Sequence, residues 1–307
     1  MSQLFGIIAP VFALIALGAF VGGRRLIEPA AFRGINDVVF FAGLPALLFL
    51  SVTDAPPLRL ADVAGSFLGA CLILFTVAVI LSRRLLRAKL ARSSVFGLNC
   101  VFGNTVMLGI PVVSAAYGSA GLANLLAIIA FHSAVLLPVA SILIEVDSEH
   151  GGNPLAVAKA VVPAILRNPI VVSILFAFAW RLGGLDLPQA LHRFLALVGP
   201  AGPPLALFCL GASLPRPSGW SDLREVGLAS LAKLALLPAL AAGLAWLAGV
   251  DGVAFKVVVL TAGLPTGANA FLLARRSDTM AEASAGTVVA STALSLVTLT
   301  ALLEWLG

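Results

Sequence analysis

Charged residues are scarce in this chain. Only 11% of its 307 residues are Asp, Glu, Lys or Arg, whereas a soluble domain usually carries about a quarter. So few charges cannot cover a water-exposed surface, and we therefore expect lipid to be the main solvent. The hydrophobic fraction of 60% agrees with this, as does the mean hydropathy of +1.08. No internal stretch is polar enough to form a second, soluble domain.

Cysteine and histidine are also few, which argues against metal sites and enzymatic centres. Cys71, Cys100 and Cys209 all lie in apolar runs, and none has a partner at a metal-ligand spacing. We expect them to be small core residues. No His, Asp and Cys constellation and no nucleotide motif is present, so we expect no enzyme, no metal and no cofactor. The net charge of +5 indicates basic cytoplasmic loops rather than nucleic-acid binding.

Long apolar runs predict a polytopic, all-α membrane protein with ten transmembrane helices. A spanning helix needs about 20 mostly apolar residues. The N-terminal run lacks a preceding positive region, and its arginines follow it, so it predicts the first helix and not a secretory signal. The expected helices cover residues 4–22, 30–51, 60–82, 93–117, 121–145, 161–181, 190–213, 222–248, 254–275 and 282–305.

The basic residues predict the orientation of these helices. Connections after the odd-numbered helices hold fourteen Lys and Arg residues, the opposite connections hold four, and Lys233 lies inside helix 8. Basic loops favour the cytoplasm. We therefore expect a multi-pass inner (plasma) membrane protein with both termini extracytoplasmic and a short cytoplasmic connection at 147–160.

Two pairs of similar segments indicate an internal repeat. "GLPALLFLSV" in helix 2 resembles "GPPLALFCLGASL" in helix 7, and "LGIP" in helix 4 resembles "AGLP" in helix 9. Both pairs have nearly the same offset. Because each half holds five helices, the halves at 1–146 and 161–307 must be inverted relative to each other. Inverted repeats are common among secondary transporters.

Glycine and proline predict breaks in helices 4 and 9, within "GNTVMLGIP" and "AGLPTGAN". Both residue types free backbone groups that lipid cannot satisfy, so an unwound segment persists only beside protein or a watery cavity. We expect two broken helices that cross near the midplane and present half-helix N-termini to an anion. The alternative is a pair of ordinary proline kinks with small residues at helix contacts.

Asparagines at these breaks are the first candidates for a binding site. The amide of Asn104 can donate two hydrogen bonds to a carboxylate, or it can tie down loosened backbone instead. Asn269 lies one turn beyond the second break, whereas Asn99 precedes the first and can simply cap or pack. The remaining candidates at the breaks are Thr105, Gly109, Pro111, Pro265, Thr266, Gly267 and Ala268.

Lys233 is the residue whose placement in the membrane costs the most free energy, because it lies about ten residues into helix 8. An intramembrane lysine is a candidate for function: it could pair with an anionic substrate or serve as a coupling group, or it could snorkel to the interface. Asp37 in helix 2 is a second candidate coupling group. For His132 in helix 5 we expect a packed, hydrogen-bonded side chain rather than a proton relay.

The chain resembles the auxin efflux carrier family in its short bacterial form, and the matching segments span most of it in family order. The resemblance implies that an asparagine at the helix 4 break contacts the substrate. The family's "KLxxxP" pattern, which this chain has at Lys233–Pro238, favours a functional lysine. The segments that carry it are "FGNTVMLGIP", "RNPIVVSILFAF", "PPLALFCLGASL", "AKLALLPAL" and "LPTGANAFLLA".

The resemblance also implies an architecture and a substrate class. It implies a scaffold of helices 1, 2, 6 and 7, a mobile transport domain of helices 3–5 and 8–10, elevator-type alternating access and a homodimer formed through the scaffold. Plant members export auxin, and bacterial members are associated with malonate, malate and similar acids. Plant relatives carry an acid and a base in helix 3, but helix 3 of this chain has neither.

We therefore expect a secondary transporter of small organic anions, mono- or dicarboxylates, across the inner membrane. The alternative is a sodium-coupled symporter of the bile-acid-carrier type, which has a related crossed-helix fold. Neither break contains Asp or Glu, which suits an anion better than a cation and leaves proton or sodium coupling unassigned.

Overall fold

The computed structural model describes residues 2–54, 60–85, 87–147, 169–184, 186–214 and 222–307. Within these ranges every regular element is a helix. The α-helices are α1 (Ser2–Gly23), α2 (Pro29–Val38), α3 (Leu44–Thr53), α4 (Leu60–Leu85), α5 (Leu90–Val101), α6 (Ile110–Val146), α8 (Pro169–Leu182), α9 (Gln189–Val198), α10 (Gly202–Ser213), α11 (Leu223–Leu231), α12 (Leu237–Leu247), α13 (Gly252–Ala262), α14 (Ala268–Arg276) and α15 (Ala281–Leu306).

Six segments of the described chain are long and apolar enough to cross a membrane, and shorter apolar helices accompany them. The chain is therefore a multi-pass membrane protein. Residues 161–168 of the helix predicted at 161–181, and residues 148–160 of the predicted connection, lie outside the described residues. The six segments are Pro29–Thr53, Ala61–Leu85, Thr105–Val146, Gln189–Ser213, Leu223–Leu247 and Ala281–Leu306.

The segment Thr105–Val146 changes direction at Gly118. A straight helix of its 42 residues would be about 63 Å long, twice the thickness of a bilayer core. Gly118 interrupts it with φ 60° and ψ −151°, a conformation that is essentially restricted to glycine. This glycine lies between the predicted helices 93–117 and 121–145 and joins them without a loop.

Prolines explain the wide turns inside three of the six segments. The π-helical turns η1 (Val39–Gly43), η2 (Thr105–Gly109) and η4 (Ala232–Leu236) each end two residues before a proline. Proline cannot donate to the carbonyl one turn earlier, and its ring clashes with that carbonyl. A widened turn relieves the clash, and such π-bulges are frequent at functional sites. The prolines are Pro45, Pro111 and Pro238.

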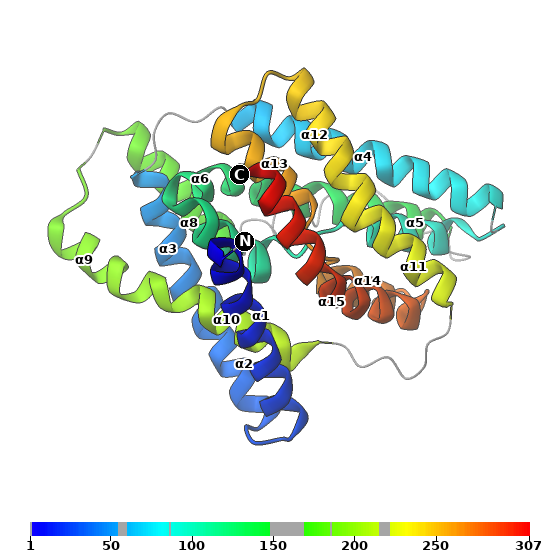
Figure 1. Cartoon of the computed structure of the whole chain (residues 1–307), viewed down its shortest axis with the longest axis horizontal. Coiled ribbons are helices and arrows are strands. Elements are labelled where there is room, and N and C mark those ends of the chain that lie inside the picture. Colours follow the sequence, from blue (N-terminus) through cyan, green and yellow to red (C-terminus); the bar gives the residue numbers. More distant parts are fainter. Residues whose placement is uncertain (1, 55–59, 86, 148–168, 185, 215–221) are drawn as a thin grey trace.

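The helices pack in two groups. One group contains α1, α2, α3, α8, α9 and α10, and its most extensive contact runs between α1 and α10. The other contains α4, α5, α6 and α11–α15. Figure 1 shows α2, α3, α9 and α10 on the left and below, with α4, α5, α11 and α12 on the right.

Small residues bring α1 and α10 into backbone contact in the first group. A Cβ on Gly18 would collide with the Phe208 carbonyl, and one on Gly211 would collide with the Ile15 carbonyl. Close approach of this kind is how membrane helices gain packing energy without a hydrophobic driving force between them. The contact therefore makes this pair of helices a tightly packed unit.

Candidate functional site

The predicted breaks lie next to each other, and their backbones are paired. α5 ends at Val101 and α13 ends at Ala262. Between the half-helices, Asn104 N–H donates to the Pro265 carbonyl at 2.9 Å, and Gly267 N–H donates to the Phe102 carbonyl at 2.8 Å. These bonds form an antiparallel bridge between Gly103 and Thr266. We call residues 102–104 and 263–267 the crossing.

A glycine allows the two backbones to come this close. A Cβ on Gly267 would lie 3.0 Å from the Gly103 carbonyl oxygen, inside ordinary contact distance. The pairing also satisfies backbone groups that two interrupted helices would otherwise leave without partners in the membrane. The crossing is therefore a compact, hydrogen-bonded unit, and not two independent kinks.

Asn104 begins the second half of the first broken helix. Its Oδ1 accepts a hydrogen bond from Met107 N–H at 3.2 Å, so the side chain is the N-cap of η2. This bond fixes the amide orientation and leaves the Nδ2 group as a donor, with no hydrogen bond from it to any described residue. The residue is 9% exposed. Asn104 therefore combines a structural bond with a free donor at the crossing.

Thr266 has a structural role. It is fully buried, its hydroxyl donates to the Asn99 carbonyl at 2.9 Å, and its N–H donates to Ser291 Oγ at 3.0 Å. Asn99 is held in turn by Ser284, whose hydroxyl donates to Asn99 Oδ1 at 2.7 Å. These bonds join α5, the crossing and α15. The sequence prediction missed Ser284 and Ser291, although a spacing of two helical turns puts them on one face of α15.

The other predicted residues lie around the crossing in different settings. Thr105 and Gly109 are buried in η2, where Gly109 N–H donates to the Asn104 carbonyl at 2.9 Å. Pro111 is buried just after this turn, in the second position of α6. Asn269 is exposed on α14, at its second position.

The matching prolines have different roles in the two broken helices. Pro265 lies inside the second break, and its carbonyl accepts the bond from Asn104. Pro111 follows the first break by seven residues and begins a continuous helix. The first break is thus centred on Gly103 and Asn104, earlier than a proline kink would put it.

Lys233 reaches the crossing from η4 in the second group. Its side chain is fully buried, so it does not snorkel to an interface. The Nζ group donates to the carbonyl of Ala262, the last residue of α13. A Cβ on Gly103 would lie 3.5 Å from Nζ. The Nζ group is therefore at the C-terminal, partially negative end of one half-helix and within contact distance of the other break.

His132 contributes a second buried nitrogen base from α6. Gly103 N–H donates to its Nε2 at 3.3 Å, and the ring packs against Phe67 and Phe102. Because Nε2 accepts, the neutral ring carries its proton on Nδ1. The prediction of a packed, hydrogen-bonded histidine agrees with this geometry, but no feature of the sequence indicates that its partner is the break itself.

No Asp or Glu residue lies within the crossing. Asp37 is exposed on α2, and no described interaction connects it to the crossing. Asp222 and Glu225, at the start of α11, bind Arg92 at 3.0 and 2.8 Å. Among the described residues no three His, Cys, Asp or Glu side chains come together as metal ligands do.

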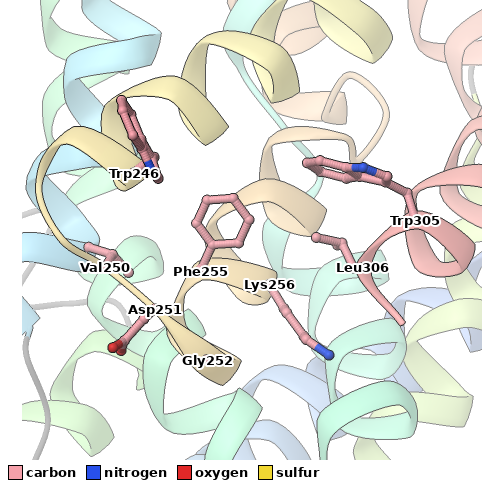
Figure 2. Close-up of a pocket in the computed structure, with 8 residues that line it drawn as sticks. All are labelled: Trp246, Val250, Asp251, Gly252, Phe255, Lys256, Trp305 and Leu306. Carbon is pink, nitrogen blue, oxygen red and sulfur yellow. The ribbon is translucent and has the colours of Figure 1, made fainter.

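A surface hollow lies away from the crossing, at the opposite end of α13. Figure 2 shows two indole rings around it, and Trp246 and Trp305 are 75% and 64% exposed. Exposed tryptophans at helix ends suit a membrane–water interface. The hollow is lined by Trp246, Val250, Asp251, Gly252, Phe255, Lys256, Trp305 and Leu306.

These features define a class of protein: a multi-pass, all-helical membrane protein whose two interrupted helices meet in a buried polar site. The family model described as "Membrane transport protein" matches residues 4–303. The chain therefore belongs to this family of membrane transport proteins, which includes the auxin efflux carriers, and the resemblance predicted from its sequence is confirmed.

Relatives from a bacterium, a plant and an archaeon match over most of the chain. A Rhizobium meliloti protein named "Putative malonate transporter" is 27% identical, with 99% of this chain and 96% of the relative covered. "Auxin efflux carrier component 8" of Arabidopsis thaliana is 24% identical, with 87% of each covered. An "Uncharacterized transporter" of Methanothermobacter thermautotrophicus is 25% identical, with 94% of each covered.

Proposed function

We propose that this protein is a secondary transporter of small carboxylates, and that the anion binds at the crossing. The observation that carries the proposal is the backbone pairing of the two breaks, which brings Asn104, α14 and Lys233 to one place. Broken helices that meet in a membrane supply polar backbone without exposing it to lipid.

The free polar groups at the crossing favour an anion. The Nδ2 group of Asn104 is a donor, and no described hydrogen bond uses the N–H groups of Ala268 and Asn269 at the start of α14. A helix N-terminus carries partial positive charge. Hydrogen bonds from such donors to a carboxylate are charge-assisted and stronger than neutral ones. Lys233 adds a formal positive charge when protonated.

The relatives support a carboxylate as the substrate class. One is named for malonate and another for auxin, and both compounds carry carboxylates. Since these relatives cover almost the whole chain, the proposal applies to the complete fold described above. The test therefore includes both monocarboxylates and dicarboxylates.

For the mechanism we propose elevator-type alternating access by two inverted five-helix repeats, ten helices in all. The packing into two groups supports a scaffold of helices 1, 2, 6 and 7 and a transport domain of helices 3–5 and 8–10. η2, which begins directly after the crossing, packs against α10 of the scaffold group. A substrate at Asn104 would thus lie near the boundary between the groups, where movement of one group relative to the other changes the side from which the substrate is accessible.

We further propose that the protein forms a homodimer through the scaffold and that both of its termini are extracytoplasmic.

The test is uptake into proteoliposomes of a carboxylate panel: malonate, malate, succinate, benzoate and indole-3-acetate. We expect uptake of at least one acid by the wild type and much weaker uptake by Asn104→Ala. The matched control is Asn124→Ala, because Asn124 is also 9% exposed but bonds within α6, to the Ala120 carbonyl. This control should transport as the wild type does.

Two outcomes would count against the proposal. Equal uptake by Asn104→Ala and wild type would move the substrate away from the crossing. No uptake of any carboxylate, combined with a response to a sodium gradient alone, would favour the sodium-coupled alternative.

A further inference from the structure

Lys233 has no counter-charge in the described protein. Its Nζ group is fully buried and donates to one carbonyl, that of Ala262. None of the described ion pairs includes it. A buried charge without a partner is costly, and a carbonyl oxygen compensates only part of that cost. An anion from outside the chain would complete the site.

The groups around Lys233 do not supply that anion. His132 on α6 and the thiol of Cys71 on α4 are its titratable neighbours. α5 also packs against η4, and its Cys100 is buried. The carboxylates on neighbouring helices lie near helix ends. They are Asp62 on α4, Glu145 on α6, Glu225 on α11, and Glu282 and Glu304 on α15.

His132 is unsuited to carry a second proton. Its Nε2 accepts the hydrogen bond from Gly103 N–H, and an imidazolium has no lone pair with which to accept. Protonation would therefore break a bond that supports the crossing, beside a second cationic group. The cluster has room for one exchangeable proton, on the Lys233 amine.

We propose that Lys233 binds one proton together with the substrate anion, so that the carrier moves both in the same direction. This inference rests on the proposed function. The amine lone pair takes a proton from water on the loading side and returns it on the other side. Proton and anion each stabilise the site for the other, and this coupling is reciprocal by linkage. Either one alone leaves a net charge in the membrane, whereas the empty carrier returns with a neutral amine.

The first test measures protons taken up when malonate binds to the purified full-length protein. Titration calorimetry in buffers of different ionisation enthalpy gives this number. We expect a value between zero and one, and an affinity that falls by up to tenfold per pH unit once the amine is deprotonated. Lys233→Arg keeps its charge at every accessible pH, so it should bind malonate with no proton uptake. Lys256→Arg, remote from the crossing, should behave as the wild type does.

The outcomes separate this inference from the proposed function. Malonate binding without proton uptake between about pH 6 and 9 would overturn the coupling and leave the carboxylate transporter intact. Proton uptake retained in Lys233→Arg would also overturn it. If no acid of the panel binds, the proposed function fails, and the coupling fails with it.

A second measurement needs no variant. One proton with a monocarboxylate carries no net charge, whereas one proton with the malonate dianion carries one negative charge. The rate of benzoate uptake into vesicles should therefore not depend on a membrane potential set with potassium and valinomycin, whereas the rate of malonate uptake should depend on it. Benzoate uptake that follows the membrane potential would contradict the proposal.

Discussion

Replacing Asn104 by aspartate separates its two roles. The new carboxylate keeps an oxygen where Oδ1 now accepts from Met107 N–H, and Asp and Asn are equally good N-caps. The Nδ2 donor, however, becomes a negative charge. Asn104→Ala loses both the cap and the donor. The two variants should therefore rank in opposite order for stability and for anion binding.

The magnitudes follow from these contacts. Loss of the cap in Asn104→Ala should cost about 1 kcal/mol of unfolding free energy, and loss of charge-assisted hydrogen bonds about 1.5–3 kcal/mol of binding. That is roughly 10- to 150-fold in affinity. Aspartate adds like-charge repulsion, about 4 kcal/mol at 4 Å with an effective dielectric constant of about 20. Asn104→Asp should thus bind a carboxylate about a thousandfold more weakly than Asn104→Ala.

Two assays on the same preparations measure these changes in stability and in anion affinity. Thermal unfolding in detergent should leave Asn104→Asp near the wild type and Asn104→Ala below it. Calorimetric titration with malonate should give measurable, weakened binding for Asn104→Ala and none for Asn104→Asp. Binding by the aspartate variant within tenfold of the wild type would refute the assignment of Asn104 as an anion ligand.

Two further predictions concern the backbone. Gly118→Ala should lower the unfolding free energy by about 1–3 kcal/mol, because Gly118 has φ 60° and ψ −151°; Gly65→Ala, a helical site with nothing within 4 Å of a new Cβ, is the control and should be neutral or stabilising. Thr266→Val should cost about 1–3 kcal/mol by leaving the buried Asn99 carbonyl unpaired, and Thr266→Ser should restore most of it. Thermal unfolding of the four variants checks both, and equal stability of Thr266→Val and wild type would show that the bond contributes nothing.

The helices and the existence of both breaks could be predicted from local sequence. Apolar runs indicate the membrane segments, and glycine and proline indicate where backbone is loosened. The pairing of the breaks could not be predicted in this way. Nothing near Gly103 specifies that Asn104 bonds to Pro265 or that Gly267 bonds to Phe102. These contacts are made by tertiary packing of segments that are distant in the sequence.

Sequence similarity also misled in one detail. "LGIP" and "AGLP" align by letters, yet Pro111 opens a helix and Pro265 lies within a break. A proline constrains only its own φ and the preceding turn, so it marks a disturbance without fixing where the chain unwinds. The buried serines of α15 were missed for a related reason: in an apolar helix, Ser284 and Ser291 look like small packing residues until their partners are known.

The polar groups that the crossing leaves free favour a negatively charged ligand. The Asn99, Phe102, Pro265 and Ala262 carbonyls all accept hydrogen bonds from the protein. Donors without a described partner remain at the crossing: the Nδ2 group of Asn104 and the first N–H groups of α14. An anion can use these donors without breaking any described bond. Lys233 strengthens this bias, because its Nζ group, bound to the end of α13, adds a positive charge at the crossing when it is protonated.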